Sequence, residues 1–204
     1  MLGGDQATKN PKRLVYAIFK SFGKEIYFSG KDSEIFNKMM KNAPVTSSIG
    51  RILDALACYL EICQIRTYDG ETAMKLEKYL KIGRPLYSFE SEIKNNVVPT
   101  IDLFRQLDEI VKGPLSEQKK GDISHSFVKK IIDDLSEIAI EYAIDNHIKC
   151  IGLTGGVSYN IPITEMVSKK VSESGLKFIV HNNIPNGDGG ISYGQNCLIG
   201  NKLK

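Results

Sequence analysis

The pattern of hydrophobic and polar residues divides the chain into a helical first part and a second part where helices alternate with strands. In the first part, apolar side chains recur three and four positions apart, which is the spacing of an amphipathic helix. The clearest helix begins after Ser47 or Ser48, and its apolar stripe consists of Ile49, Ile52, Leu53, Leu56, Ala57 and Leu60. Further helices are predicted over residues 11–23, over 33–41, and between the Tyr68-Asp69-Gly70 turn and Gly83. Residues 1–84 are therefore expected to form a mainly helical cap or insertion.

The pattern changes after residue 84. Leu86 to Ile93 alternates loosely between apolar and polar residues, and Val97 to Leu103 does the same after the turn signal Asn95-Asn96. Two such segments around a turn predict a β-hairpin. Later segments predict helices over 102–111, 122–147, 161–174 and 191–200, and strands over 149–153 and 176–181. A hairpin followed by alternating helices and strands indicates a small mixed sheet with helices packed on it.

The most informative stretch is residues 149–163, which read KCIGLTGGVSYNIPI. A short apolar run reaches the pair Gly155-Gly156, where the missing side chains allow another molecule to approach the backbone. Asn160 is in position to cap the following helix, which has Pro162 in its first turn. A strand, a glycine turn and a helix N-terminus are typical of a nucleotide site, although Gly-Gly alone also fits an ordinary strand-to-helix turn.

A second glycine turn follows the next strand, over residues 186–190. This second glycine turn, just after the next strand, favours the nucleotide site over the ordinary turn. Residues 85–204 are therefore expected to form a mixed-sheet nucleotide-binding subdomain.

Composition and charge exclude several classes of protein. The chain has 42% hydrophobic and 25% charged residues, which is ordinary for a globular protein. Its net charge of +3 is too small to argue for a nucleic-acid partner. No apolar run approaches the roughly 18 residues of a membrane span, and the first residues lack a signal-peptide segment. A cytoplasmic protein without membrane contact is expected. Its cysteines lack zinc or redox spacing and are expected to be reduced: Cys58, Cys63, Cys150 and Cys197.

No complete set of catalytic side chains is recognisable. The three histidines, His125, His147 and His181, lie far apart and lack the spacing of metal ligands. No Ser/His/Asp or Cys/His combination is apparent, so an enzyme with this sequence would need a nucleophile from elsewhere. Asp54 lies off the apolar stripe of its helix, about 130° from the centre of the stripe at 100° per residue. The pattern alone leaves Asp54 open between a solvated side chain and a functional one.

Several motifs together resemble the HypF family of carbamoyltransferases, which act in NiFe-hydrogenase maturation. The resemblance rests on LGGD at 2–5, SSIGRILDALACYL at 47–60, TYDGETAMKLE at 67–77, LTGGVSYN at 153–160 and IPNGDGGISYGQ at 184–195. The tRNA threonylcarbamoyladenosine transferases share the glycine motif and a similar aspartate helix, but the Gly-Gly-Asp start and the GISYGQ ending favour HypF. The resemblance implies an α/β fold of the actin/sugar-kinase/chaperone type (ASKHA, ribonuclease H-like), of which this chain holds the later portion.

The resemblance also implies which parts of the family lie outside this sequence. These are an acylphosphatase-like domain, zinc fingers, an adenylate-forming domain, and the start of the transferase domain with its metal-binding histidine motif. Because Met1 stands directly before LGGD, we expect a truncated fragment or the product of a split gene.

The site residues of the family carry over one position at a time. Asp54 matches the aspartate that holds the nucleotide ribose in the sister family, and Gly70 lies in a turn that approaches the nucleotide. Gly155 and Gly156 match the glycines that flank the adenosine. Asn160 matches an asparagine that contacts the nucleotide.

The resemblance assigns Asp188 to a divalent metal site, of iron or zinc, in the complete domain. The turn reads Asn-Gly-Asp where the family has Asn-Asp, and Phe127-Val128 stands where the family often has Phe-His. A single carboxylate cannot hold a transition metal well. The isolated chain is therefore expected to carry no stoichiometric iron or zinc and to be inactive alone.

The implied reaction moves a carbamoyl group from carbamoyl-adenylate, made from ATP, to the C-terminal cysteine of HypE. The thiolate of HypE would then be the nucleophile that this sequence lacks, and the missing N-terminal part of HypF would be a second partner. Two alternatives stay open. One is a transferase of the tRNA threonylcarbamoyladenosine type, which would favour a basic surface. The other is a nucleotide-binding or docking module without activity of its own.

Overall fold

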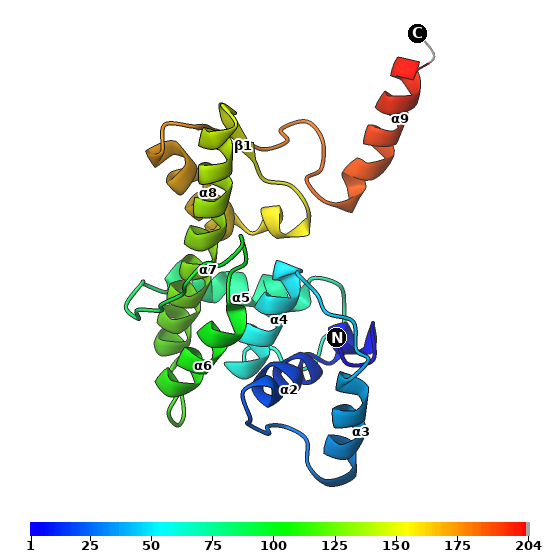
Figure 1. The fold of residues 1–204 in the computed structure, drawn as a ribbon, viewed down its shortest axis with the longest axis vertical. Helices are drawn as coiled ribbons and strands as arrows, with labels where there is room; N and C mark the ends of the chain where they lie inside the picture. The colour runs from blue at the N-terminus through cyan, green and yellow to red at the C-terminus, as the bar shows by residue number, and fades with distance from the viewer. Residues whose placement is uncertain (203–204) are drawn as a thin grey trace. The chain divides into compact units, whose positions relative to one another are not determined.

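The computed structural model describes residues 1–202 and consists mainly of helices joined by loops (Figure 1). The chain forms two compact units, which meet between Ile131 and Ile132. This division falls inside the longest helix, α7 (Glu117–Asp145). The sequence pattern instead predicts a division after residue 84, into a helical cap and a nucleotide-binding subdomain. That division concerns function and stays a prediction.

The first unit contains short helices around a buried central helix, α4. They are α1 (Gln6–Lys9), α2 (Lys12–Ser21), α3 (Gly30–Met40), α4 (Ile49–Tyr59), α5 (Glu71–Ile82) and α6 (Thr100–Ile110). Helix α4 packs against both α2 and α5, and α2 also packs against α6. The helices predicted from the apolar periodicity of the first part are confirmed, because their apolar stripes form this core.

Neighbouring helices bury more of the surface of α4 than its apolar stripe alone. Leu53, Ala55, Leu56, Ala57 and Cys58 are each 1% exposed or less. The small alanine side chains leave room for neighbouring helices to approach. As a result Asp54, which lies outside the stripe, is also buried and only 3% exposed. The interpretation of Asp54 as a merely solvated side chain is therefore excluded.

The hairpin predicted over residues 86–103 is wrong. The segment forms a single antiparallel bridge, between Lys94 and Val97, and α6 begins at Thr100. Side chains of α7, instead of a partner strand, accept hydrogen bonds from the backbone here. The Arg84 N–H donates to Asp122 Oδ1 at 2.9 Å, and the Tyr87 N–H donates to Ser126 Oγ at 3.1 Å. The loose alternation thus reflects a loop laid along a helix, not a strand with a partner strand.

The second unit contains a βαβ crossover. Strand β1 (Cys150–Gly152) pairs in parallel with β2 (Lys177–Ile179), and Ile151 lies opposite Phe178. The connection consists of the 3-10 turn η1 (Gly156–Tyr159) and helix α8 (Ile161–Glu173), which packs on β2. The turn η2 (Asp188–Gly190) and helix α9 (Ile191–Lys202) follow.

These elements confirm the predicted α/β class, with a mostly helical chain and a small sheet. Within residues 1–202 the sheet has two strands and is parallel, so it lacks the antiparallel strands that the hairpin would have added. The helix predicted over 161–174 is confirmed, and it buries Ile163, Val167 and Val171. This packing positions the loop between β1 and α8, which holds the paired glycines.

Candidate functional site

Hydrogen bonds join the two glycine turns of the second unit. The Gly155 N–H donates to the Asn186 carbonyl at 2.7 Å, and the Thr154 hydroxyl donates to the same oxygen at 3.0 Å. The Gly187 N–H donates to the Tyr159 hydroxyl at 2.9 Å. The loop after β1 and the turn after β2 therefore form one surface, with Asp188 one residue beyond the last of these contacts.

The paired glycines present bare backbone. Gly155 has φ +93°, which residues with side chains rarely adopt, whereas the φ of Gly156 lies outside this region. Beyond their chain neighbours, no atom of the described chain lies within 4 Å of the place where a Cβ of either residue would be. The space beside both residues is open to a ligand.

Asn160 caps helix α8 and is 6% exposed. Its side-chain oxygen accepts a hydrogen bond from the Ile163 N–H at 3.3 Å, as predicted for a helix cap. Its amide nitrogen is buried and lacks a hydrogen-bond partner among residues 1–202. A buried donor of this kind is costly unless something accepts from it, so it fits a site that a ligand completes.

Asp54 forms a charged cluster with two arginines in the first unit. Its Oδ2 lies 2.9 Å from Arg51 Nη2 and 4.0 Å from Arg66 Nη1. Neither approach is aligned as a hydrogen bond, and Oδ2 has no such partner in the described part of the chain. Burial raises the pKa of Asp54, although Arg51, Arg66 and the Thr72 hydroxyl act against this rise.

The turn that carries Gly70 is held at both of its ends. Gly70 precedes α5 with φ +84°. On one side Arg66 Nε donates to the Tyr68 carbonyl at 3.0 Å, and Arg66 Nη2 pairs with Asp69. On the other side Glu71 Oε2 accepts from the Thr67 N–H at 2.6 Å and from the Thr67 hydroxyl at 2.8 Å.

The environment of Glu71 stabilises its ionised carboxylate. The hydrogen bond from Lys75, followed by those from Thr67, lowers the pKa of Glu71 to about 2. Glu71 is only 5% exposed, so an ionised carboxylate here needs these partners. Glu71 is therefore an anchor for the Gly70 turn.

The structure thus groups the predicted site residues in two sets. Asp54 and Gly70 belong to the first unit, where Arg66 contacts both the carboxylate and the turn. The second set, in the second unit, consists of Gly155, Gly156, Asn160 and Asp188.

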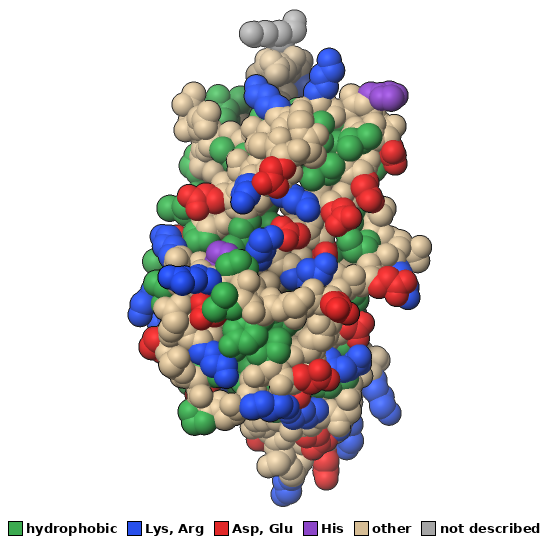
Figure 2. All heavy atoms as spheres, turned by 90° about the vertical axis from the view of Figure 1, so that its left-hand side faces the viewer, with side chains coloured by type: hydrophobic (Ala, Val, Ile, Leu, Met, Phe, Trp, Pro, Cys, Tyr) green, Lys and Arg blue, Asp and Glu red, His purple; other side chains and the backbone are tan. Residues whose placement is uncertain are grey.

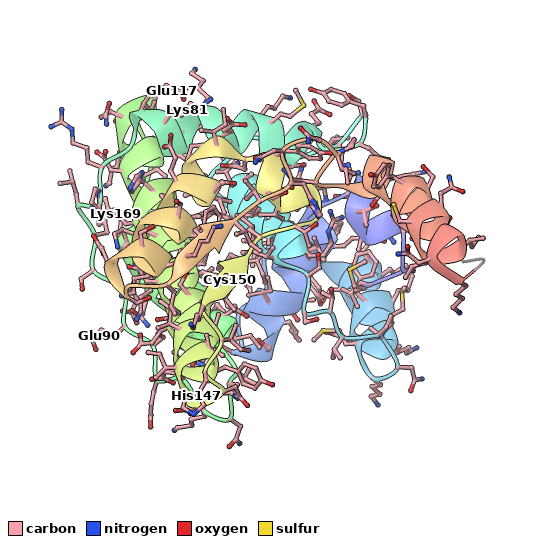
Figure 3. All side chains as sticks on the ribbon, turned by 90° about the horizontal axis from the view of Figure 1, so that it is seen from above. Lys81, Glu90, Glu117, His147, Cys150 and Lys169 are labelled. Carbon is pink, nitrogen blue, oxygen red and sulfur yellow. The ribbon has the colours of Figure 1, made fainter. Side chains whose placement is uncertain are left out.

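Asp188 does not make a metal site by itself. It is exposed at the start of η2. No group of three or more His, Cys, Asp and Glu side chains that could hold a metal occurs within residues 1–202. His125 Nδ1 lies 2.9 Å from the Leu80 carbonyl, and His147 lies in the turn after α7 (Figure 3). The residues present therefore do not fit a complete iron or zinc site.

The sequence pattern missed three charged residues of these sets: Arg51, Arg66 and Glu71. Arg51 precedes Asp54 by three positions on α4, and this helical spacing was a usable signal. Glu71 follows Thr67 by four positions, but through a turn. Arg66 had no signal, since its partner Asp54 lies on a different element.

The surface shows no large field of one charge on the face drawn in Figure 2, where Lys and Arg side chains are intermixed with Asp and Glu. Among the described helices, none is both long and apolar enough to cross a membrane.

Comparison with known proteins identifies relatives over nearly the whole chain. The family described as "Carbamoyltransferase, Kae1-like Domain, second subdomain" matches residues 1–195. The probable carbamoyltransferase HypF of Methanocaldococcus jannaschii is 39% identical over 206 residues, which cover 95% of this chain and 26% of that protein. HypF of Rhodobacter capsulatus is 24% identical over 100% of this chain and 27% of its own length. The chain therefore spans about a quarter of these relatives.

Half of the chain is also similar to a tRNA-modifying transferase. The tRNA N6-adenosine threonylcarbamoyltransferase of Fusobacterium nucleatum is 30% identical over 106 residues, which are 50% of this chain and 29% of that protein. The expected relation between the two transferase families is confirmed.

Solved structures agree with the sequence relatives. The crystal structure of T. kodakarensis HypF matches 100% of this chain and 29% of its own, with a TM-score of 0.84 and 30% identity. A full-length HypF in a phosphate- and nucleotide-bound form has the same fold over 99% of this chain and 28% of its own, with a TM-score of 0.74 and 22% identity. The chain belongs to the HypF carbamoyltransferase family, as a second subdomain of the Kae1-like domain.

Proposed function

We propose that this chain forms the later part of a site that transfers a carbamoyl group from carbamoyl-adenylate, formed from ATP, to the C-terminal cysteine of HypE. The observation that carries the proposal is the pair of glycine turns joined at Asn186, with the buried amide of Asn160 beside them. Membership of a carbamoyltransferase family supports the reaction class.

The nucleotide is expected to lie against the open backbone of Gly155 and Gly156. The N-terminus of α8 places the positive end of the helix dipole close by, which favours the phosphate of AMP. The amide nitrogen of Asn160 can donate to the nucleotide. The family resemblance assigns the ribose to Asp54, which the first unit holds beside Arg51 and Arg66.

The transfer step needs a thiolate nucleophile. The sulfur of the HypE cysteine attacks the carbamoyl carbon and forms an S–C bond, while the C–O bond to the AMP phosphate breaks and AMP leaves with the electron pair. The thiol proton goes to solvent before the attack. The role of this chain is to position the donor and to stabilise the charge on the leaving phosphate.

Two of the four cysteines of this chain are poor candidates for the nucleophile. Cys58 and Cys63 are buried. Burial raises the pKa of Cys58 to about 12, so its thiolate is scarce at neutral pH. A thiol acceptor from HypE also fits a reducing compartment, which supports a cytoplasmic reaction.

The relation to the tRNA transferases sustains a second candidate function, in which the carbamoylated acceptor is a tRNA adenosine. The small net charge of +3 counts against it, because a tRNA partner favours a strongly basic surface. A docking module without activity is the third candidate.

The deciding experiment combines this chain with the preceding part of HypF, supplies ATP and carbamoyl phosphate, and follows HypE by mass spectrometry. Carbamoylation of the HypE C-terminal cysteine, with none on a Cys→Ala HypE, is the expected result. Modified tRNA with unmodified HypE would support the second candidate. Binding of HypE without transfer would support the docking module.

A further inference from the structure

Arg66 lies between the two site elements of the first unit, and its side chain is 12% exposed. Its Nη1 faces Asp54 Oδ2 at 4.0 Å, its Nε donates to the Tyr68 carbonyl, and its Nη2 pairs with Asp69. The Arg66 N–H also donates to the Lys9 carbonyl at 3.1 Å, which fixes the backbone before the turn. The turn therefore engages Nε and Nη2, while Nη1 faces Asp54 at ion-pair distance, an arrangement that uses the several donors of one guanidinium group.

Arg51 approaches the same Asp54 oxygen but differs in what else it contacts. It lies three residues before Asp54 on the same helix, with Nη2 at 2.9 Å from Oδ2. Its ion-pair partner lies on α4, and its effect on Asp54 is electrostatic. Of the two arginines, Arg66 alone has partners on both α4 and the turn before α5. Arg51 is thus a matched control with the same charge near the same carboxylate.

The Gly70 turn depends on such contacts because it contains few buried groups. Tyr68, Asp69 and Gly70 are exposed, and Gly70 has a left-handed φ. The pair of Arg66 with the exposed Asp69 is expected to contribute little by itself. The bond from Arg66 Nε to the Tyr68 carbonyl has an ionised donor and holds the backbone of the turn directly, so it restrains the turn more strongly.

We propose that Arg66 is a positioning residue that holds the Asp54 carboxylate and the Gly70 turn in one fixed geometry for the nucleotide. This inference rests on the proposed function, since it assigns both elements to the nucleotide site. Arg66 acts through Asp54 and the turn and need not touch the ligand. Glu71 restrains the other end of the same turn through Thr67.

The test replaces Arg66 by lysine, which keeps the charge near Asp54 but loses the fork. In the assembled HypF, Arg66→Lys is expected to weaken the binding of AMP about tenfold, as measured by calorimetry. Amide hydrogen exchange of residues 68–72 in the same protein should accelerate. Arg51→Lys should leave that exchange rate as in the wild type.

A double-mutant cycle separates positioning from general destabilisation. If Arg66 acts through Asp54, the effects of Arg66→Lys and Asp54→Asn on nucleotide affinity should be less than additive. Additive effects, or unchanged exchange of the turn in Arg66→Lys, would overturn the inference. A wild-type protein that binds no adenine nucleotide would overturn the proposed function instead, and the exchange data alone would then decide whether Arg66 holds the turn.

Discussion

At the scale of single residues, the chain has a buried charge and a strained glycine backbone, and each of these features lowers stability. Asp54 is a carboxylate inside a helical core, and Gly155 adopts a backbone conformation that disfavours side chains. Such features are retained at functional sites more often than in plain cores. They lead to two predictions about individual positions.

Gly156→Val should abolish nucleotide binding while the chain stays folded. The Cβ of Gly156 would meet open space in the protein, so the added side chain occupies the expected place of the ligand. Calorimetric titration with AMP measures the affinity, and a thermal melt checks the fold. Gly200→Val, which also faces open space, is the control. Unchanged AMP affinity in Gly156→Val would show that the nucleotide does not lie against this glycine.

Glu71→Gln should make the stability of the chain less sensitive to acid. The pKa of Glu71 is lowered to about 2 by Lys75 and Thr67, so its ionised form stabilises the native state above the usual pKa of a glutamate, near 4.5. This contribution falls as the pH drops from about 4.5 towards 2. Urea unfolding at several pH values should show a steeper loss in the wild type than in Glu71→Gln. Equal slopes would contradict the prediction, and Glu34→Gln, on the exposed side of α3, is the control.

At the scale of elements, function depends on how helices begin and how closely they pack. The cap of α8 is also a candidate ligand group, and the end of α5 contacts α7 through two glycines. The packing of α5 against α7 is close at Gly83, because a Cβ there would lie 2.0 Å from the Gly121 carbonyl oxygen.

Asn160→Asp should separate the capping role of this residue from its proposed ligand role. Aspartate caps helices as well as asparagine, so the melting temperature should change little, whereas the amide donor is lost. AMP affinity, measured by calorimetry, should therefore fall. Asn160→Ala removes the cap as well and should cost about 1 kcal/mol of stability. An Asp variant that binds AMP like the wild type would show that the buried amide nitrogen serves no ligand.

Gly83→Ala should destabilise the first unit. The methyl group would clash with backbone of α7, and separating the two helices costs about 1–3 kcal/mol by analogy with overpacked cores. Gly50→Ala is the matched control, because its nearest neighbour outside the adjoining residues is Ser48 Oγ at 3.5 Å. Chemical denaturation of both variants gives the comparison. Equal stabilities would show that the contact at Gly83 relaxes without cost.

At the scale of the whole molecule, the chain corresponds to one part of longer relatives. It spans about a quarter of the relatives to which it is similar, and its candidate residues fall in two units. Asp188 is the one carboxylate that the family resemblance assigns to metal, and the described residues around it contain no further set of ligands.

The isolated chain should therefore bind less than stoichiometric iron or zinc after purification, because transition-metal sites usually need three or more protein ligands. Addition of the histidine-bearing segment of HypF should produce a metal-containing complex, and Asp188→Ala should remove the metal from it. Elemental analysis measures both. One tightly bound metal per isolated chain would show that the ligand assignment is wrong.

The sequence alone determined the features that depend on near neighbours along the chain. The apolar periodicity specified α2, α4, α5 and α8, because each helix buries a face defined by positions three and four apart. The cap at Asn160 and the glycine turns follow from local conformational preferences. The motifs that carry the family resemblance are likewise short and contiguous.

Only the tertiary structure decided what distant side chains do to a segment. Residues 86–103 alternate like strands. However, Asp122 and Ser126 of α7 accept hydrogen bonds from the backbone N–H groups of Arg84 and Tyr87, and α6 begins where the second strand was expected. Asp54 is buried because α2 and α5 cover α4, which its periodicity could not reveal. Arg66 acquires its position between Asp54 and the Gly70 turn only when the loop folds back on α4. Each of these outcomes depends on contacts between residues far apart in the sequence, and local pattern carries no information about such contacts.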